Sequence, residues 1–169
     1  MTTAFLFTPS HVANFLLEKA ECEKIRMTPL KLLKLVYLSY GWVRAVLDKR
    51  LFDEPIEAWK LGPVTPSLYH EFKRFANNPI TGRSISMDEN GATSICSIPS
   101  SHQETILVIE KCWDVYKPFT ASALVNKTHE PDTPWAKYYK PHTDIKIPDE
   151  EIKAYFVKKI GEYMNAASR

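Results

Sequence analysis

Glycine and cysteine are scarce in this chain, which has five glycines and three cysteines among 169 residues. Five glycines leave little material for loops that cradle phosphates, and we find no P-loop, dinucleotide-binding fingerprint or G-x-S-x-G motif. The three cysteines are Cys22, Cys96 and Cys112. Their count is odd and no two have the close spacing of metal ligands, so we expect reduced, structural thiols and a cytoplasmic protein.

A strong net charge and a long apolar run are also missing. The net charge of +2 gives no overall attraction to nucleic acid or membrane. The first residues, MTTAFLF, lack a basic region, so we expect no signal peptide. No segment is long and apolar enough for a membrane span. The hydrophobic content of 44% is ordinary, and we predict one domain over 1–169 with a substantial core.

The segment 28–47, TPLKLLKLVYLSYGWVRAVL, dominates the chain. Thr28 is expected to cap a helix whose first residue is Pro29. The helix would be apolar nearly all round, so it must be covered on most sides and lie at the centre of the core. We expect it to bend or stop near Gly41. Lys31 and Lys34 are interpreted as solvated lysines whose stems cover apolar neighbours.

Other helices are predicted from apolar periodicity and capping signals. They start at Thr8-Pro9, at Thr65-Pro66, at a capping box over 101–104, at Thr120 and at Thr133-Pro134, and the last runs over 149–164. Their expected inner faces include Tyr69 in the third helix and Tyr163 in the last. The predicted class is α+β, mainly α: a compact bundle of about five to six helices around the central helix, with a small antiparallel β-hairpin or sheet.

Two regions carry strand signals. The segment 55–61 alternates weakly and predicts a short strand or extended segment, which we expect Gly62-Pro63 to end. Asn90-Gly91 is the strongest hairpin signal in the chain and predicts a β-hairpin within 80–99. Because an isolated hairpin is only marginally stable, pairing between this hairpin and 56–61 is the arrangement we consider.

We find no catalytic constellation. None of the five histidines has metal-ligand spacing. His129 precedes a carboxylate and could serve as a general base, but a hydrogen-bonded turn histidine is the favoured interpretation. The acidic residues at 53–54 and 149–151 are explained as turn and helix-start residues. We therefore expect no enzyme, no cofactor and no metal.

Two rigid turns, 59–63 and 129–135, are the candidate partner-binding surface. Prolines fix their backbones, so neighbouring side chains lose little entropy on binding. Aromatic and polar anchors of the kind that dominate interfaces lie there. The candidate residues are Trp59, Lys60, Pro63, Tyr69, His129 and Trp135. The alternative is that the turns pack on each other and close the fold, with both tryptophans in the core.

Three blocks carry a family likeness: LKLLKLVYLSYGW (30–42), LFDEPIEAWKLGPVTPSLYHEFK (51–73) and LVNKTHEPDTPW (124–135). In this order they resemble the Panacea-domain proteins, which include the SocA-like antitoxins and the phage-associated GepA-like proteins. The likeness runs from about residue 11 to residue 156, and the segment 80–99 matches no family motif. It implies an antitoxin that neutralises a protein toxin by direct contact. SocA-like members are also linked to delivery of the toxin to a cytoplasmic protease.

Two other functions stay open at this point. One is a phage or prophage protein that binds and inhibits a host defence factor. The other is a DNA-binding regulator, although no recognition helix is strongly basic and the basic residues are scattered. The only cluster we expect comprises Lys60, Lys73, Arg74 and Arg83. An enzyme is the least favoured class.

Overall fold

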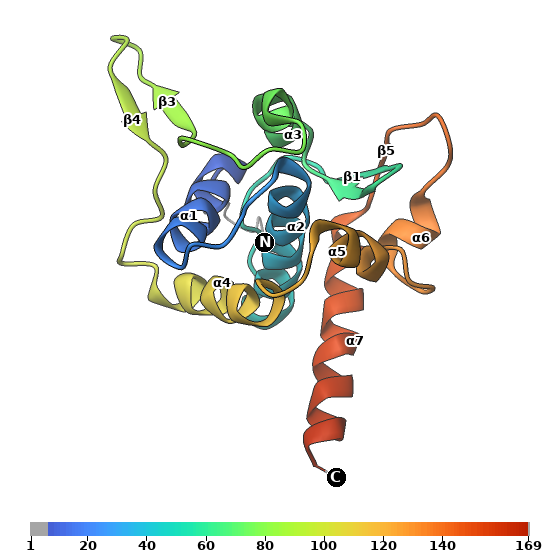
Figure 1. The fold of residues 1–169 in the computed structure, drawn as a ribbon. Coiled ribbons are helices and arrows are strands. Elements are labelled where there is room, and N and C mark those ends of the chain that lie inside the picture. The colour runs from blue at the N-terminus through green and yellow to red at the C-terminus, as the bar shows by residue number, and fades with distance from the viewer. Residues whose placement is uncertain (1–6, 169) are drawn as a thin grey trace.

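A single helix, α2 (Pro29–Leu47), lies at the centre of the molecule. Around it lie α1 (Pro9–Cys22), α4 (Gln103–Tyr116), α5 (Ala121–Thr128) and α7 (Asp149–Ala167) (Figure 1). The computed structural model describes residues 7–168. Side chains on all faces of α2 are buried, and Leu32, Leu35 and Val36 have no exposed surface. An all-round apolar helix requires such covering, so the predicted central position is confirmed.

The remaining helices follow the predicted order. They are α1 (Pro9–Cys22), α3 (Pro66–Phe72) with the 3-10 turn η1 (Lys73–Phe75), α4 (Gln103–Tyr116), α5 (Ala121–Thr128), α6 (Pro134–Tyr138) and α7 (Asp149–Ala167). Helices α1, α2, α3 and α6 each begin with a threonine N-cap and a proline at the first helical position. The mainly helical α+β class is confirmed. The predicted capping box at Ser101 is wrong, because the N-cap of α4 is His102.

The helix does not stop at Gly41, because α2 is helical from Pro29 to Leu47. The glycine instead permits a close approach of α7. A Cβ placed on Gly41 would lie 2.0 Å from Cε2 of Phe156, whose ring occupies this space. Gly41 is therefore a packing residue between two helices.

The first sheet contains β1 (Glu57–Trp59), β2 (Gly62–Val64) and β5 (Ile145–Lys146) in the order β2-β1-β5. β1 pairs antiparallel with both neighbours. We expected Gly62-Pro63 to end the extended region, but these residues start a second strand, β2. Gly62 of β2 pairs with Trp59 of β1. Gly62 has φ of +105°, a conformation that glycine adopts without strain.

The predicted hairpin is β3 (Ile85–Met87) and β4 (Thr93–Ile95), which form a separate two-stranded sheet. The considered pairing with 56–61 is wrong. The hairpin projects from the body near α1 (Figure 1). Its base is held by buried Asn14, whose Nδ2 donates to the carbonyl oxygens of Ser84 and Cys96, both over 2.8 Å. One buried amide thus attaches both strands to α1.

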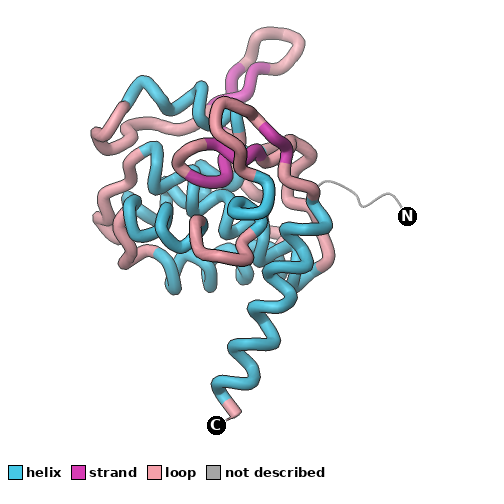
Figure 2. The backbone as a smooth tube through the Cα atoms, turned by 90° about the vertical axis from the view of Figure 1, so that its right-hand side faces the viewer, coloured by secondary structure: helices cyan, strands magenta, loops and turns pink. Residues whose placement is uncertain are grey.

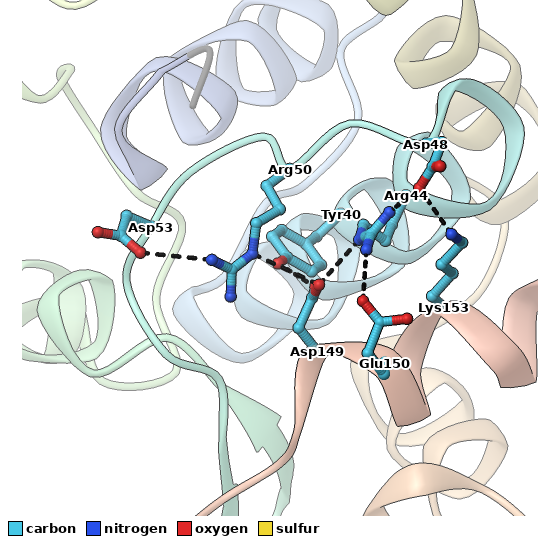
Figure 3. Close-up of polar contacts among 8 residues, drawn as sticks. All are labelled: Tyr40, Arg44, Asp48, Arg50, Asp53, Asp149, Glu150 and Lys153. Atoms are coloured by element: carbon cyan, nitrogen blue, oxygen red, sulfur yellow. Dashed lines mark hydrogen bonds and ion pairs between the residues drawn. The ribbon is translucent and has the colours of Figure 1, made fainter. Parts of the chain in front are cut away.

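An ion-pair network joins the end of α2 to the start of α7 (Figure 3). Arg44, only 4% exposed, donates from Nε to Oδ2 of Asp149 over 2.9 Å and from Nη2 to Oε1 of Glu150 over 2.8 Å. Tyr40 donates its hydroxyl to Oδ1 of Asp149 over 2.5 Å. Asp48 accepts from Arg44 and from Lys153. Arg44 therefore attaches the first turn of α7 to the end of α2.

Candidate functional site

The two predicted turns lie side by side. Trp135, placed by α6, donates its indole Nε1–H to the carbonyl oxygen of Trp59 in β1 over 2.7 Å. Both indole side chains are half-buried. Thr133 holds the second turn in place, because its hydroxyl donates to the carbonyl oxygen of Thr128 over 2.9 Å and accepts from the N–H of Ala136. Segments about seventy residues apart in the sequence therefore form one surface.

Aromatic stacking fixes the second turn. The ring of His129 lies parallel to Trp135 with centroids 3.6 Å apart, and Trp135 stacks on Tyr139 at 4.6 Å. His129 Nε2 is buried and has no hydrogen-bond partner among residues 7–168. Burial, and then the charge of Lys34, lower the pKa of His129. The expected hydrogen-bonded turn histidine is thus corrected to a stacked imidazole that favours the neutral form.

Lys34 lies beneath the first turn, contrary to the expectation of a solvated lysine. It is 1% exposed, and its Nζ donates to the carbonyl oxygen of Pro63 over 2.6 Å. Burial lowers the pKa of Lys34 to about 7. No carboxylate pairs with it within the described part of the chain. Lys31 is also buried and donates to the carbonyl oxygen of Lys117 over 2.7 Å.

The absence of a side chain at Gly62 leaves room for the ammonium group of Lys34. A Cβ at Gly62 would lie 2.8 Å from Nζ of Lys34 and 2.8 Å from Oγ1 of Thr128. Pro63 is itself buried, so it contributes through its carbonyl group and not through its ring. The buried position of Lys34 cannot be recognised from the sequence, because its neighbours Gly62 and Thr128 come from distant segments. The one local signal was its position in a helix that is apolar on all sides.

The outer part of the first turn is exposed and forms a ridge, which we define as residues 59–61. Lys60 is exposed, and Leu61 is 54% exposed. Tyr69 packs edge-on against Trp59 with centroids 5.0 Å apart and is 38% exposed. The prediction that Tyr69 faces inward is therefore wrong. Trp59 is oriented further by its own Nε1–H, which donates to Glu57 over 2.8 Å.

A groove runs along each side of the ridge. One, of about 410 Å³, has apolar walls including Leu30 and Leu33 and also contacts Lys60 and Lys73. The other, of about 430 Å³, lies between the ridge and the segment 139–144. No acidic side chain lines the first groove among the residues that the structure describes. The first groove therefore combines aromatic, aliphatic and positively charged groups, whereas Asp144 contributes a carboxylate to the second.

The expected basic cluster is only partly available for ligand binding. Arg83 pairs with Glu21, and the guanidinium of Arg74 lies over the Phe75 ring at 4.9 Å. Lys60 and Lys73 make no ion pair within residues 7–168. The described residues include no group of three His, Cys, Asp or Glu side chains able to hold a metal ion. Of the helices in the same part of the chain, none has the length and apolarity to cross a membrane.

All three cysteines are free thiols. Cys96 and Cys112 are buried, whereas Cys22 is exposed, so the expected structural role does not hold for Cys22. Burial raises the pKa of the Cys112 thiol to about 12. Its sulfur accepts a hydrogen bond from Ser39 at 3.7 Å. A thiol with such a raised pKa is a poor nucleophile, and Cys112 acts as a packing residue.

Comparison with known proteins gives one family. The model described as "Antitoxin SocA-like, Panacea domain" matches residues 32–136, which contain both turns of the site. Antitoxin SocA of Caulobacter vibrioides (strain NA1000 / CB15N) is 37% identical over 128 residues, which cover 73% of this chain and 66% of that relative. The chain thus spans slightly less than two thirds of the relative's length. No solved structure matches it. The resemblance seen in the sequence is confirmed, and the chain belongs to the SocA-like antitoxin family with a Panacea domain.

Proposed function

We propose that this protein is a cytoplasmic antitoxin that neutralises a protein toxin by direct binding and has no enzymatic activity of its own. The proposal is supported by the SocA-like antitoxin family to which the chain belongs and by its similarity to Antitoxin SocA of Caulobacter vibrioides. The observation that carries the proposal is the exposed ridge over residues 59–61, which lies within the region matched by the family model.

The ridge has the properties of a preorganised binding surface. Lys60 and Leu61 on the ridge and Tyr69 beside it offer a charge, an aliphatic group and an aromatic ring to a partner. The β1–β2 pairing and the hydrogen bond from Trp135 hold the backbone beneath them. A rigid surface loses little entropy on binding, and aromatic anchors contribute strongly to interfaces. In this proposal His129 and Trp135 support the ridge, and the exposed side chains contact the toxin.

The variants Leu61→Asp and Lys60→Glu test the proposal when each is co-expressed with the candidate toxin, the protein encoded by the adjacent gene. Each substitution changes an exposed side chain, so we expect lost neutralisation with melting within about 3 °C of the wild type, a shift that corresponds to about 1 kcal/mol for a domain of this size. Met87→Asp is the matched control, since Met87 is 70% exposed on the separate hairpin. A toxin still neutralised by both ridge variants would refute the proposed surface, and loss with Met87→Asp alone would place the interface on the hairpin.

Delivery of the bound toxin to a protease is a further part of the proposal, supported by the family resemblance alone. It is tested by the toxin's half-life in cells with and without each cytoplasmic protease. We expect the toxin to be degraded faster when the antitoxin is present. If the toxin's half-life is the same with and without the antitoxin, delivery to a protease is contradicted and neutralisation occurs by binding alone.

A further inference from the structure

Four exposed apolar side chains lie together away from the ridge, where the end of α2 meets α4 and α7. Val46, Leu107, Val115 and Tyr163 are between 51% and 58% exposed. They line a groove of about 480 Å³, whose only charged lining residue among those described is Lys111. Exposed apolar side chains that gather in one groove are a feature of interaction sites.

The second half of α7 extends beyond the body of the molecule (Figures 1 and 2). Residues 161–168 are all exposed. Val157, 45% exposed, and Met164, 66% exposed, are seven residues apart and so lie on the same face of the helix. Tyr163 is 58% exposed, so its predicted inward position is wrong, although its ring lies beside Trp42 of α2 with centroids 5.9 Å apart. A short helix in water depends on packing of its apolar face, and the face that carries Val157 and Met164 is exposed in the single copy.

We propose that two copies of this chain associate through these features, with the projecting half of α7 from one copy lying in the α2–α4–α7 groove of the other. An apolar helix and an apolar groove that accepts a helix are complementary surfaces. Both are present on one chain and share Tyr163, so one two-fold axis would satisfy both grooves and both helices.

The dipole of α7 favours the same occupant. The C-terminal end of a helix carries partial negative charge, and the charged group in the groove is the cation Lys111. Lys111 makes no ion pair within residues 7–168. α7 also lies outside residues 32–136, which the family model matches, so the projecting helix is separate from the ridge where we place the toxin.

Sedimentation equilibrium or light scattering of the full chain tests this inference. We expect twice the chain mass of 19.4 kDa at high concentration. Leu107→Asp in the groove and Met164→Asp on the helix should each give monomers with unchanged melting, since both side chains are exposed. Leu61→Asp is the control, because Leu61 is a similarly exposed apolar residue on the ridge and should leave the dimer intact.

Mixing the Leu107→Asp and Met164→Asp variants provides a more specific test of the proposed contact. In each variant alone, both symmetric contacts are damaged. A mixed pair keeps one intact contact, formed by the helix of the Leu107→Asp chain and the groove of the Met164→Asp chain, so the mixture should recover part of the dimer. A wild-type monomer at all concentrations, unchanged dimers in both variants, or no recovery on mixing would each overturn the inference. If the wild type is monomeric and Leu107→Asp abolishes toxin neutralisation, the groove binds the toxin instead.

Discussion

Nζ of Lys34 in the central helix donates to the carbonyl oxygen of Pro63 over 2.6 Å, which attaches the core directly to the strand behind the exposed ridge. A cation in this position has no carboxylate partner among residues 7–168. Burial of a charge without such a partner is costly, and a lysine responds by losing its proton more readily. The ridge is therefore supported by a group whose charge changes near neutral pH.

Stability should depend on pH through Lys34. Its pKa is lowered to about 7 in the folded protein, from 10.5 ordinarily. Between these values the unfolded chain binds more protons, so the free energy of unfolding rises with pH, by at most about 1.4 kcal/mol per pH unit. The cost of burial is complete below pH 7 and disappears toward pH 10.5.

The measurement compares chemical unfolding of the wild type and Lys34→Met from pH 7 to pH 9. This pH window lies above the pKa values of His11 and His129, which are lowered from 6.5 in the folded protein. We expect a shallower pH dependence in Lys34→Met. Lys60→Met, at an exposed lysine, should retain the wild-type slope. Parallel curves for wild type and Lys34→Met would contradict the assignment.

Gly62→Ala should destabilise the protein by more than Gly82→Ala. Both glycines have positive φ, +105° and +96°, so both substitutions carry backbone strain of about 1–3 kcal/mol. Only at Gly62 would the new methyl group also crowd Lys34 and Thr128, since nothing lies within 4 Å at Gly82. Thermal melting of the two variants isolates the crowding, and equal shifts would show that Lys34 moves aside without cost.

Gly41→Ala and Gly161→Ala should have opposite effects. Both glycines are helical, but a Cβ at Gly41 meets the Phe156 ring at 2.0 Å, and nothing lies within 4 Å at Gly161. We expect Gly41→Ala to lose about 1–3 kcal/mol through overpacking and Gly161→Ala to gain about 0.5–1 kcal/mol through helix propensity. Adding Phe156→Leu to Gly41→Ala should cost less than the sum of the two changes. Strict additivity in this double-mutant cycle would argue against the contact.

Arg44→Met should destabilise the protein by about 3 kcal/mol, because it leaves the partly buried Asp149 carboxylate without its main cation. Lys159→Met is the control. Lys159 pairs with Glu162 over 2.8 Å near the surface, and such pairs contribute less than about 1 kcal/mol. Urea unfolding distinguishes the two, and similar losses would mean that the Arg44 network is no stronger than a surface pair.

Local signals in the sequence predicted the helices well. Threonine caps and a following proline start a helix through contacts within one turn, so Thr28-Pro29 and Thr133-Pro134 could be read without knowledge of the fold. The central position of α2 followed from its apolar residues, and the hairpin from Asn90-Gly91. The two turns of the site were also identified, although their role in binding stays a prediction.

Tertiary structure alone decided the environment of the site. The burial of Lys34 depends on Pro63, and the position of Trp135 depends on a carbonyl group at Trp59. Gly41 suggested a helix break until Phe156, more than one hundred residues away, was seen to occupy the space. The sequence by itself therefore determined where helices begin, since that depends on neighbours along the chain. Strand partners, lysine burial and the exposed ridge required the fold, because their energies come from groups that only folding brings together.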